Sequence, residues 1–144
     1  MRLLAAAIVA LGALAACGER EPSSAAPRVE LKVRVSDGEG QTARATLECR
    51  GRRARVTGFL RRARSRPCGF ARREARFLAS RPDPDRVCTE VFGGPDTARV
   101  TGRIGKRRVD RRFSRSDGCA IADWDRASRL FAGAPGSRLR RDPA

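Results

Sequence analysis

Residues 29–35 read VELKVRV, a strict alternation of aliphatic and charged side chains. Successive side chains of a β-strand point to opposite faces, so this pattern predicts a strand with one buried face and one face in water. Residues 43–49 (ARATLEC) alternate in the same way, and Ser36–Gly40 supplies a glycine-containing turn between the two segments. Together they predict an antiparallel hairpin.

A second hairpin is predicted nearer the C-terminus. Residues 98–104 (ARVTGRI) alternate again, Gly105-Lys106 turns the chain, and residues 109–113 (VDRRF) run back with Arg111 on the same side as Val109. We expect Leu130-Phe131 to add a closing strand.

The segments between and after the hairpins favour helices. Pro67 stands where a first helical turn tolerates proline, and apolar residues then recur at helical spacing up to Leu78. Residues 121–125 predict a short C-terminal helix. The chain therefore predicts an α+β fold: an antiparallel sheet of about five strands, with one main helix and a short C-terminal helix packed on one face.

The N-terminus has the features of an export signal. Arg2 precedes an uncharged apolar stretch, residues 3–14, which is too short to span a membrane because a spanning helix needs about 20 apolar residues. The sequence Leu14-Ala15-Ala16-Cys17 matches the bacterial lipobox, in which the cysteine becomes the lipidated first residue. We predict a lipoprotein signal peptide at residues 1–16, lipidation at Cys17 and an extracytoplasmic, membrane-anchored protein. If the lipobox is not used, the protein is secreted.

The rest of the chain divides into three parts. Residues 17–27 hold the predicted lipidated cysteine and a small, polar, proline-containing stretch that predicts a flexible tether. Residues 28–131 carry all the periodic segments and form one domain. Residues 132–144 are small, polar and basic, and are predicted to be a disordered tail.

We expect disulfides, rather than a large core, to hold this domain together. Leucine, isoleucine, valine and phenylalanine make up only about 17% of the chain after residue 16, and the formal net charge is +16, a composition typical of disordered chains. In an exported protein, four cysteines predict two disulfides with three possible connectivities, each stabilising the fold by roughly 3–4 kcal/mol; free thiols are the alternative. These cysteines are Cys49, Cys68, Cys88 and Cys119.

Signatures of catalysis and metal binding are scarce. The chain contains no histidine, which excludes a Ser-His-Asp triad, a Cys-His pair and a His-ligated metal, and it has no CxxC spacing for zinc. The paired carboxylates Asp83/Asp85 and Asp123/Asp125 stand in turn or cap contexts, where aspartate is common. We therefore predict no enzyme activity, no metal and no cofactor.

Several segments form a specific combination along the domain. They are Ala45–Cys49 (ATLEC), Cys68 at a helix start, Cys88–Pro95 (CTEVFGGP), Val100–Gly102 followed by Gly105–Arg107, and Phe113 shortly before Cys119. This combination resembles the subtilisin inhibitor-like family, small secreted bacterial proteins that block serine proteases, over about residues 33–131. The resemblance implies disulfides Cys49–Cys68 and Cys88–Cys119, a five-stranded antiparallel sheet with helices on one face, and a homodimer formed through the sheet.

The resemblance also implies a reactive site. By position, the scissile bond falls between Glu90 and Val91, with Thr89 at P2, Cys88 at P3 and Phe92 at P2′. A protease binds substrate as an extended strand, and a strand already fixed in shape binds tightly because its ordering cost was met on folding. From the residues alone, the other interpretation is a strand that enters the Gly-Gly-Pro turn.

The acidic residue at the expected P1 position limits which class of serine protease could be the target. The family commonly has a large apolar or basic P1 residue, whereas Glu90 would place an unpaired charge in an apolar S1 pocket at a cost of several kcal/mol. The expected partner is therefore an extracellular serine protease that prefers glutamate and has a basic S1 pocket.

The charge of the chain suggests a further class of partner. Arginine supplies nearly all of the positive charge, but the chain has no tyrosine and one tryptophan, so the stacking surfaces of single-strand nucleic-acid binders are missing. We predict no specific nucleic-acid binding, and adhesion to membranes or anionic cell-surface polymers instead. The alternative function is a non-inhibitory lipoprotein of the same fold that binds an anionic cell-surface partner.

Overall fold

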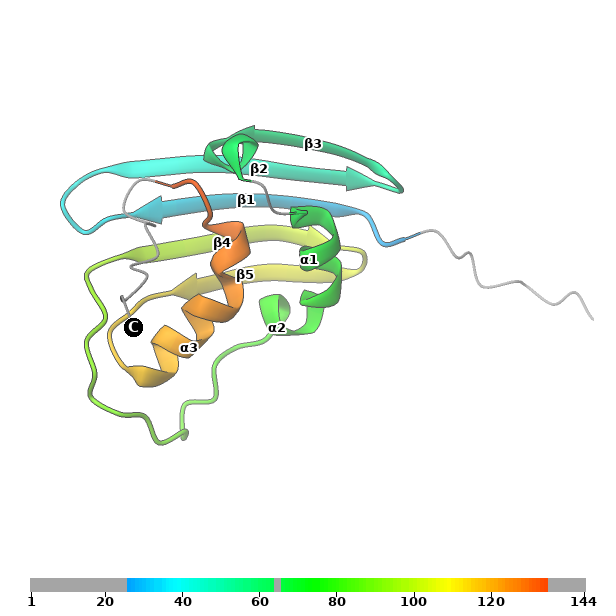
Figure 1. Ribbon diagram of the computed structural model, residues 1–144. Coiled ribbons are helices and arrows are strands. Elements are labelled where there is room, and N and C mark those ends of the chain that lie inside the picture. The colour runs from blue at the N-terminus through cyan, green and yellow to red at the C-terminus, as the bar shows by residue number, and fades with distance from the viewer. Residues whose placement is uncertain (1–25, 64–65, 135–144) are drawn as a thin grey trace, which may run out of the picture.

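The structure is a computed structural model that describes residues 26–63 and 66–134 (Figure 1). The predicted signal peptide, the lipidation site Cys17 and residues 135–144 of the predicted tail lie outside the described residues. The chain packs on the domain as far as Ala134, a buried residue whose N–H donates to the carbonyl oxygen of Phe131 over 3.1 Å. The packed chain thus continues past the predicted boundary at residue 131.

The architecture is a single antiparallel sheet with helices on one face, which confirms the predicted α+β class. The strand order is β3-β2-β1-β4-β5, so β1 is central: it forms the first predicted hairpin with β2 and pairs on its other side with β4 of the second hairpin. The strands are β1 (Val29–Ser36), β2 (Thr42–Arg50), β3 (Arg53–Gly58), β4 (Thr97–Ile104) and β5 (Arg107–Phe113). The helices are α1 (Pro67–Arg73), α2 (Ala75–Ala79) and α3 (Gly118–Ala127), with 3₁₀ turns η1 (Phe59–Arg62) and η2 (Ser128–Leu130).

The alternation in β1 sets the two faces of the sheet. Its aliphatic residues are buried and its charged residues are exposed, as predicted. Val33 lies opposite Ala45 of β2 and Val100 of β4, so apolar residues of neighbouring strands meet on one face. The helices α1, α2 and α3 cover that face (Figure 1).

Aromatic rings join the C-terminal segment to the sheet. The ring of Trp124 on α3 lies 4.6 Å from that of Phe131, which in turn lies 5.3 Å from Phe113 of β5, measured between centroids. All three side chains are buried. Trp124 is therefore a core residue, as the sequence predicts.

Three secondary-structure predictions need correction. The fifth strand is β3, an arginine-rich edge segment, whereas Leu130 closes a 3₁₀ turn and Phe131 follows it. The main helix is divided at Glu74 into α1 and α2. The short C-terminal helix is longer than predicted, because it begins at Gly118.

Two disulfides join the layers, and they are Cys49–Cys68 and Cys88–Cys119. The first links β2 to α1, and the second links the segment before β4 to α3. Both pairings implied by the resemblance are confirmed. Each bond stabilises a domain of this kind by roughly 3–4 kcal/mol in the chain-entropy account, which offsets the small apolar content.

Candidate functional site

The segment between α2 and β4 is the candidate site. From Ser80 to Asp96 the chain forms neither helix nor strand, and it passes around α3 before it returns to the sheet (Figure 1). We call this segment the exposed loop. The predicted extended stretch Val87–Phe92 lies within it and pairs with no strand of the sheet.

The exposed loop presents large apolar side chains to solvent. Val87 is 98% exposed, Phe92 68% and Val91 57%, and these are the large apolar side chains that the described part of the chain leaves exposed. Apolar side chains gathered on an otherwise polar surface are typical of protein-binding sites.

On its N-terminal side, the loop is fastened to α3 by three contacts of different kinds. The guanidinium of Arg86 lies 3.0 Å from the carboxylate of Asp123. Cys88 is bonded to Cys119. The carbonyl oxygen of Thr89 accepts a hydrogen bond of 2.9 Å from the N–H of Gly118, the first residue of α3.

Gly118 allows this close approach because it lacks a side chain. A methyl group at this position would overlap Oγ1 of Thr89. A larger residue would therefore force the Thr89 side chain to turn, whereas its Cβ and carbonyl oxygen stay at contact distance. Glycine lets the Thr89 side chain lie directly against the start of α3.

On its C-terminal side, the loop is fastened by Arg115. The N–H of Gly93 donates to the carbonyl oxygen of Arg115 over 2.8 Å. The guanidinium of the same arginine lies 3.3 Å from the carboxylate of Asp96, which is nearly buried. We call Arg115–Asp123 the anchoring segment, because every contact described on either side of the tip ends on it.

Between the two fastenings stands the tip, which we define as Glu90–Phe92. All three side chains are exposed. Glu90 forms no ion pair within the described residues, although basic side chains are frequent in the chain. The backbone of the tip is therefore held at both ends while its side chains point into solvent.

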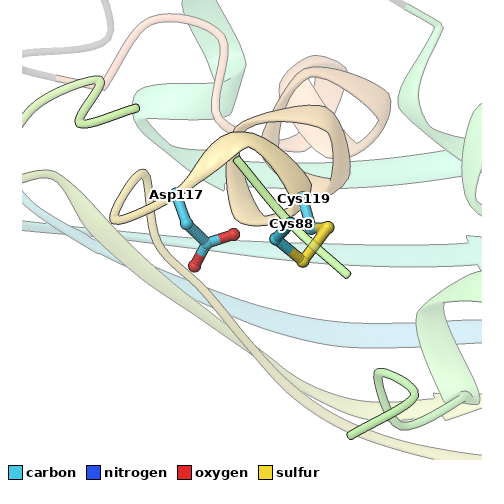
Figure 2. A group of neighbouring side chains, drawn as sticks. All are labelled: Cys88, Asp117 and Cys119. Carbon is cyan, nitrogen blue, oxygen red and sulfur yellow. A yellow bond between two sulfur atoms is a disulfide. The ribbon is translucent and has the colours of Figure 1, made fainter. Parts of the chain in front are cut away.

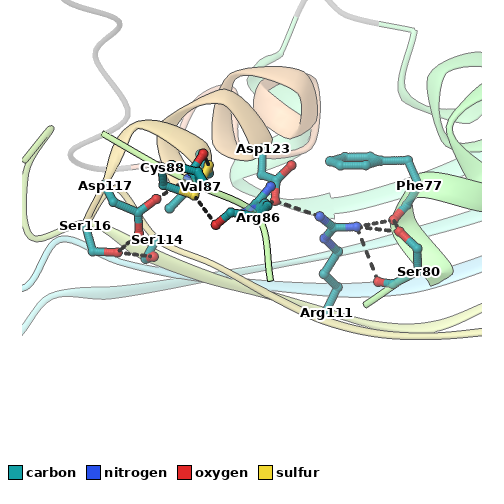
Figure 3. A network of polar contacts seen from close by, with 12 residues as sticks. Phe77, Ser80, Arg86, Val87, Cys88, Arg111, Ser114, Ser116, Asp117 and Asp123 are labelled. Atoms are coloured by element: carbon teal, nitrogen blue, oxygen red, sulfur yellow. Dashed lines mark hydrogen bonds and ion pairs between the residues drawn. A yellow bond between two sulfur atoms is a disulfide. The ribbon is translucent and has the colours of Figure 1, made fainter. Parts of the chain in front are cut away.

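A buried arginine of β5, Arg111, binds the anchoring segment from the side of the sheet. The Arg111 side chain is 4% exposed, and its guanidinium donates to the Phe77 carbonyl oxygen and, over 2.8 Å, to the Ser80 hydroxyl (Figure 3). It lies 4.1 Å from the centroid of the Phe77 ring and forms an ion pair of 2.8 Å with Asp123. Because Asp123 also binds Arg86, this network links β5 and α2 to the exposed loop.

Two titrating groups of this region are perturbed by the fold. Burial lowers the pKa of the Arg111 guanidinium, and the Asp123 carboxylate opposes that shift. The Asp117 carboxylate caps α3, and its hydrogen bonds from the Ala120 N–H and then from the Ser116 hydroxyl lower its pKa. Asp117 therefore stays ionised and fixes the start of the helix to which the loop is bound.

One cluster at the site resembles a metal-binding group. The sulfur atoms of Cys88 and Cys119 and a carboxylate oxygen of Asp117 lie within 4.8 Å of one another (Figure 2). The sulfurs are bonded to each other, so neither offers the thiolate that a metal needs. The cluster is a structural disulfide next to Asp117, the N-cap residue of α3.

The structure brings the predicted site residues Cys88, Thr89, Glu90, Val91 and Phe92 together on the exposed loop. Cys49 and Cys68 lie at the other end of the helix layer, next to α1. The sequence does not predict the anchoring contacts of Arg86, Arg115 and Gly118.

Two sequence interpretations near the site are corrected. Asp117 caps α3 and Gly118 begins it, upstream of the helix predicted at residues 121–125. Asp123 lies inside α3 and is paired with two arginines rather than serving as a turn or cap residue. The pair Asp117-Gly118, followed by residues 119–121, could have been recognised as a helix start.

Within the described residues, no helix has both the length and the apolar character needed to cross a bilayer. No protein-family model, curated protein or solved structure matches this chain.

Proposed function

We propose that this protein inhibits an extracellular serine endopeptidase by presenting its exposed loop as a substrate, with Glu90–Val91 as the scissile bond. The observation that carries the proposal is the tip: three exposed residues between a disulfide-linked anchor and a hydrogen-bonded anchor, both on the anchoring segment Arg115–Asp123. The similarity to the subtilisin inhibitor-like family points to the same bond.

Fastening at both ends explains how such a loop would inhibit rather than serve as an ordinary substrate. The ordering cost of the loop is met on folding, so more of the contact energy is available for binding. After acylation, the anchors at Thr89 and Gly93 hold the two new ends close together. The leaving amine therefore stays near the acyl-enzyme, which slows hydrolysis.

The exposed side chains indicate the chemistry of the target. In this register, Val87 occupies P4, Val91 P1′ and Phe92 P2′, and all three present apolar surface. Glu90 occupies P1 and requires a cationic S1 pocket, because burying an unpaired carboxylate costs several kcal/mol. The target has a basic S1 pocket flanked by apolar subsites.

The location follows from the N-terminal signal. A lipid on Cys17 and the tether up to residue 27 would hold the inhibitor outside the cell at the membrane surface. It would act on proteases that reach that surface.

Inhibition assays test the proposal directly. The purified protein is titrated against serine endopeptidases that cleave after glutamate, after basic residues and after large apolar residues. We expect slow, stoichiometric inhibition of the glutamate-specific enzyme, weakened by Glu90→Gln. The matched control is Glu48→Gln, which removes the same charge from an exposed position of β2, away from the loop. If no member of the panel is inhibited, the proposal is rejected.

A further inference from the structure

The uncovered face of the sheet carries an ordered array of charge. Side chains that point away from the core are polar in all five strands. The strand register places four of these residues side by side across β2, β1, β4 and β5, because Arg34 lies opposite both Arg44 and Arg99, and Arg99 lies opposite Arg112. We call these four residues the arginine row.

Next to the arginine row runs a row of shorter side chains. Thr46 lies opposite Thr57 of β3 and Lys32 of β1, and Lys32 lies opposite Thr101 of β4. Thr46 and Thr101 are half-buried, whereas the neighbouring arginines are exposed. We call this second row the trough: the half-buried Thr46 and Thr101 are its low points, the exposed Lys32 stands between them, and Asp110 of β5 lies opposite Thr101.

Open depressions confirm that this face is hollowed. One of about 440 Å³ is lined by Arg34, Arg99 and Arg112, and another of about 350 Å³ by Lys32, Arg44 and Thr101. A third, of about 530 Å³, lies beside them. Together they give the trough room for a chain-like ligand.

The fold itself is not stabilised by the arginine row. Like charges directly opposite each other on neighbouring strands destabilise a sheet. Arg99 is compensated by Asp110, through hydrogen bonds of 2.9 Å and 3.0 Å. Within the described chain Arg34, Arg44 and Arg112 form no ion pair. Three guanidinium groups are therefore free to bind an anionic ligand.

We propose that this face binds a linear phosphodiester polymer without bases, such as a polyol-phosphate chain of a cell wall, laid along the arginine row. The planar guanidinium group matches the geometry of phosphate oxygens and stays charged at all relevant pH values. Neighbouring strands are 4.7–4.9 Å apart, so the row extends over about 14 Å and spans more than one phosphate. The Thr101 hydroxyl offers a hydrogen bond to such a chain, whereas the Thr46 hydroxyl is already bonded to that of Thr57 at 2.6 Å.

The chemistry of the face favours this occupant over three others. None of the described side chains that point outward from the sheet is aromatic, so nucleic-acid bases would find no ring to stack on. No apolar side chain stands there to enter a bilayer. A second copy of the chain would bring two arginine rows together, so we expect that the homodimer through the sheet implied by the resemblance does not form on this face.

Polymer binding does not compete with the exposed loop. The loop is fastened to α3, which covers the opposite face of the sheet (Figure 1). The two proposals thus stand on different residues, and either can fail without the other.

The test compares two triple variants that lose the same charge. Arg34→Gln with Arg44→Gln and Arg112→Gln empties the arginine row, whereas Arg73→Gln with Arg76→Gln and Arg81→Gln removes three exposed arginines near the helices. Every protein carries Cys17→Ser, so that no lipid contributes. Thermal unfolding checks the fold, and the row variant should unfold at the same or a higher temperature because like-charge neighbours are removed.

Binding is measured against poly(glycerol phosphate) at several salt concentrations. We expect the row variant to bind at least about tenfold more weakly, with a salt slope reduced by about 2 on the log–log scale, since each lost phosphate contact removes 0.7–0.9 from the slope. The helix-side variant should keep its affinity within about twofold. Equal losses in the two variants would show that net charge alone drives binding and would overturn the proposal. Tighter binding to a thymidine oligonucleotide, or to phosphatidylglycerol vesicles, than to the polymer would also overturn it.

Discussion

Arg111 of β5 and Asp123 of α3 form an ion pair with a nitrogen–oxygen distance of 2.8 Å, in which the arginine side chain is 4% exposed and the aspartate side chain 18%. Asp123 is also 3.0 Å from Arg86 at the N-terminal side of the exposed loop. One carboxylate therefore neutralises a buried cation and orients the loop, which couples the stability of the domain to the position of the candidate site.

Asp123→Asn should destabilise the domain by about 3 kcal/mol, because it leaves the buried guanidinium of Arg111 without its counter-charge. Urea unfolding measures the effect as a lower midpoint with an unchanged slope. The same variant should inhibit the target protease less tightly, because Arg86 loses its partner.

Asp110→Asn is the matched control for this prediction. It removes the same charge from an exposed pair with Arg99 on the open face, and it should leave the urea midpoint nearly unchanged. Similar losses in the two variants would contradict a special role for the buried pair.

Removing the two disulfides one at a time should separate stability from inhibition. Cys88→Ala with Cys119→Ala, and Cys49→Ala with Cys68→Ala, should each destabilise the domain by about 3–4 kcal/mol. Inhibition measured below the unfolding transition should be lost only in the first variant, because only Cys88 borders the tip. Inhibition that survives the loss of Cys88–Cys119 would show that the reactive loop does not depend on this disulfide.

Replacement of Glu90 by arginine should redirect inhibition without affecting the fold. Its side chain is exposed, so the free energy of unfolding should change by less than about 0.5 kcal/mol. Inhibition of the glutamate-specific protease should weaken by at least about 100-fold, since a cation in a basic S1 pocket is unpaired. A trypsin-like protease should become the new target. The inhibition constants for both enzymes are measured. Unchanged specificity would show that Glu90–Val91 is not the reactive bond.

The stability of the domain should depend on the ionisation of Asp117. Its pKa is lowered in the fold, so its contribution is complete above the pKa of an unfolded aspartate and is lost as the pH falls through the folded-state value. The difference in free energy of unfolding between the native chain and Asp117→Ala should be constant near neutral pH and shrink below about pH 4. Asp117→Asn keeps a hydrogen-bond acceptor but carries no charge. Its free energy of unfolding should likewise fall less at acidic pH than that of the native chain. A constant difference down to pH 2 would contradict this role.

The sequence predicts those parts of the fold in which one face is buried and the other is wet. Strands β1, β2, β4 and β5 have this pattern, and the structure confirms them. Strand β3 (RARVTG) alternates too, but it lies at the sheet edge and its residues on the core side are only Ala54 and the half-buried Val56, so its apolar face is too small to mark a strand. Leu130 and Phe131 are both buried because a helical turn places neighbours on the core, and two residues are too few to distinguish that turn from a strand.

The features that the sequence does not predict depend on contacts between residues far apart in the chain. Glu74, where the main helix is divided, pairs with Arg126 at 2.8 Å, 52 positions along the chain. The support of the exposed loop depends in the same way on Arg111 and Arg115, which belong to or follow β5. A local pattern can predict that the segment around Cys88 is tethered, but not that the anchoring segment Arg115–Asp123 holds both of its ends.

The Cys88–Cys119 bond closes a covalent ring that contains the Glu90–Val91 peptide. A single nick at that peptide opens the ring and releases no fragment, so the clipped molecule gains one water and otherwise keeps its mass until the disulfide is reduced. The new carboxylate at Glu90 and the new amine at Val91 remain on the same scaffold, through Thr89 and Gly93. If Glu90–Val91 is the reactive bond, as we propose, intact and nicked forms should interconvert on the protease surface.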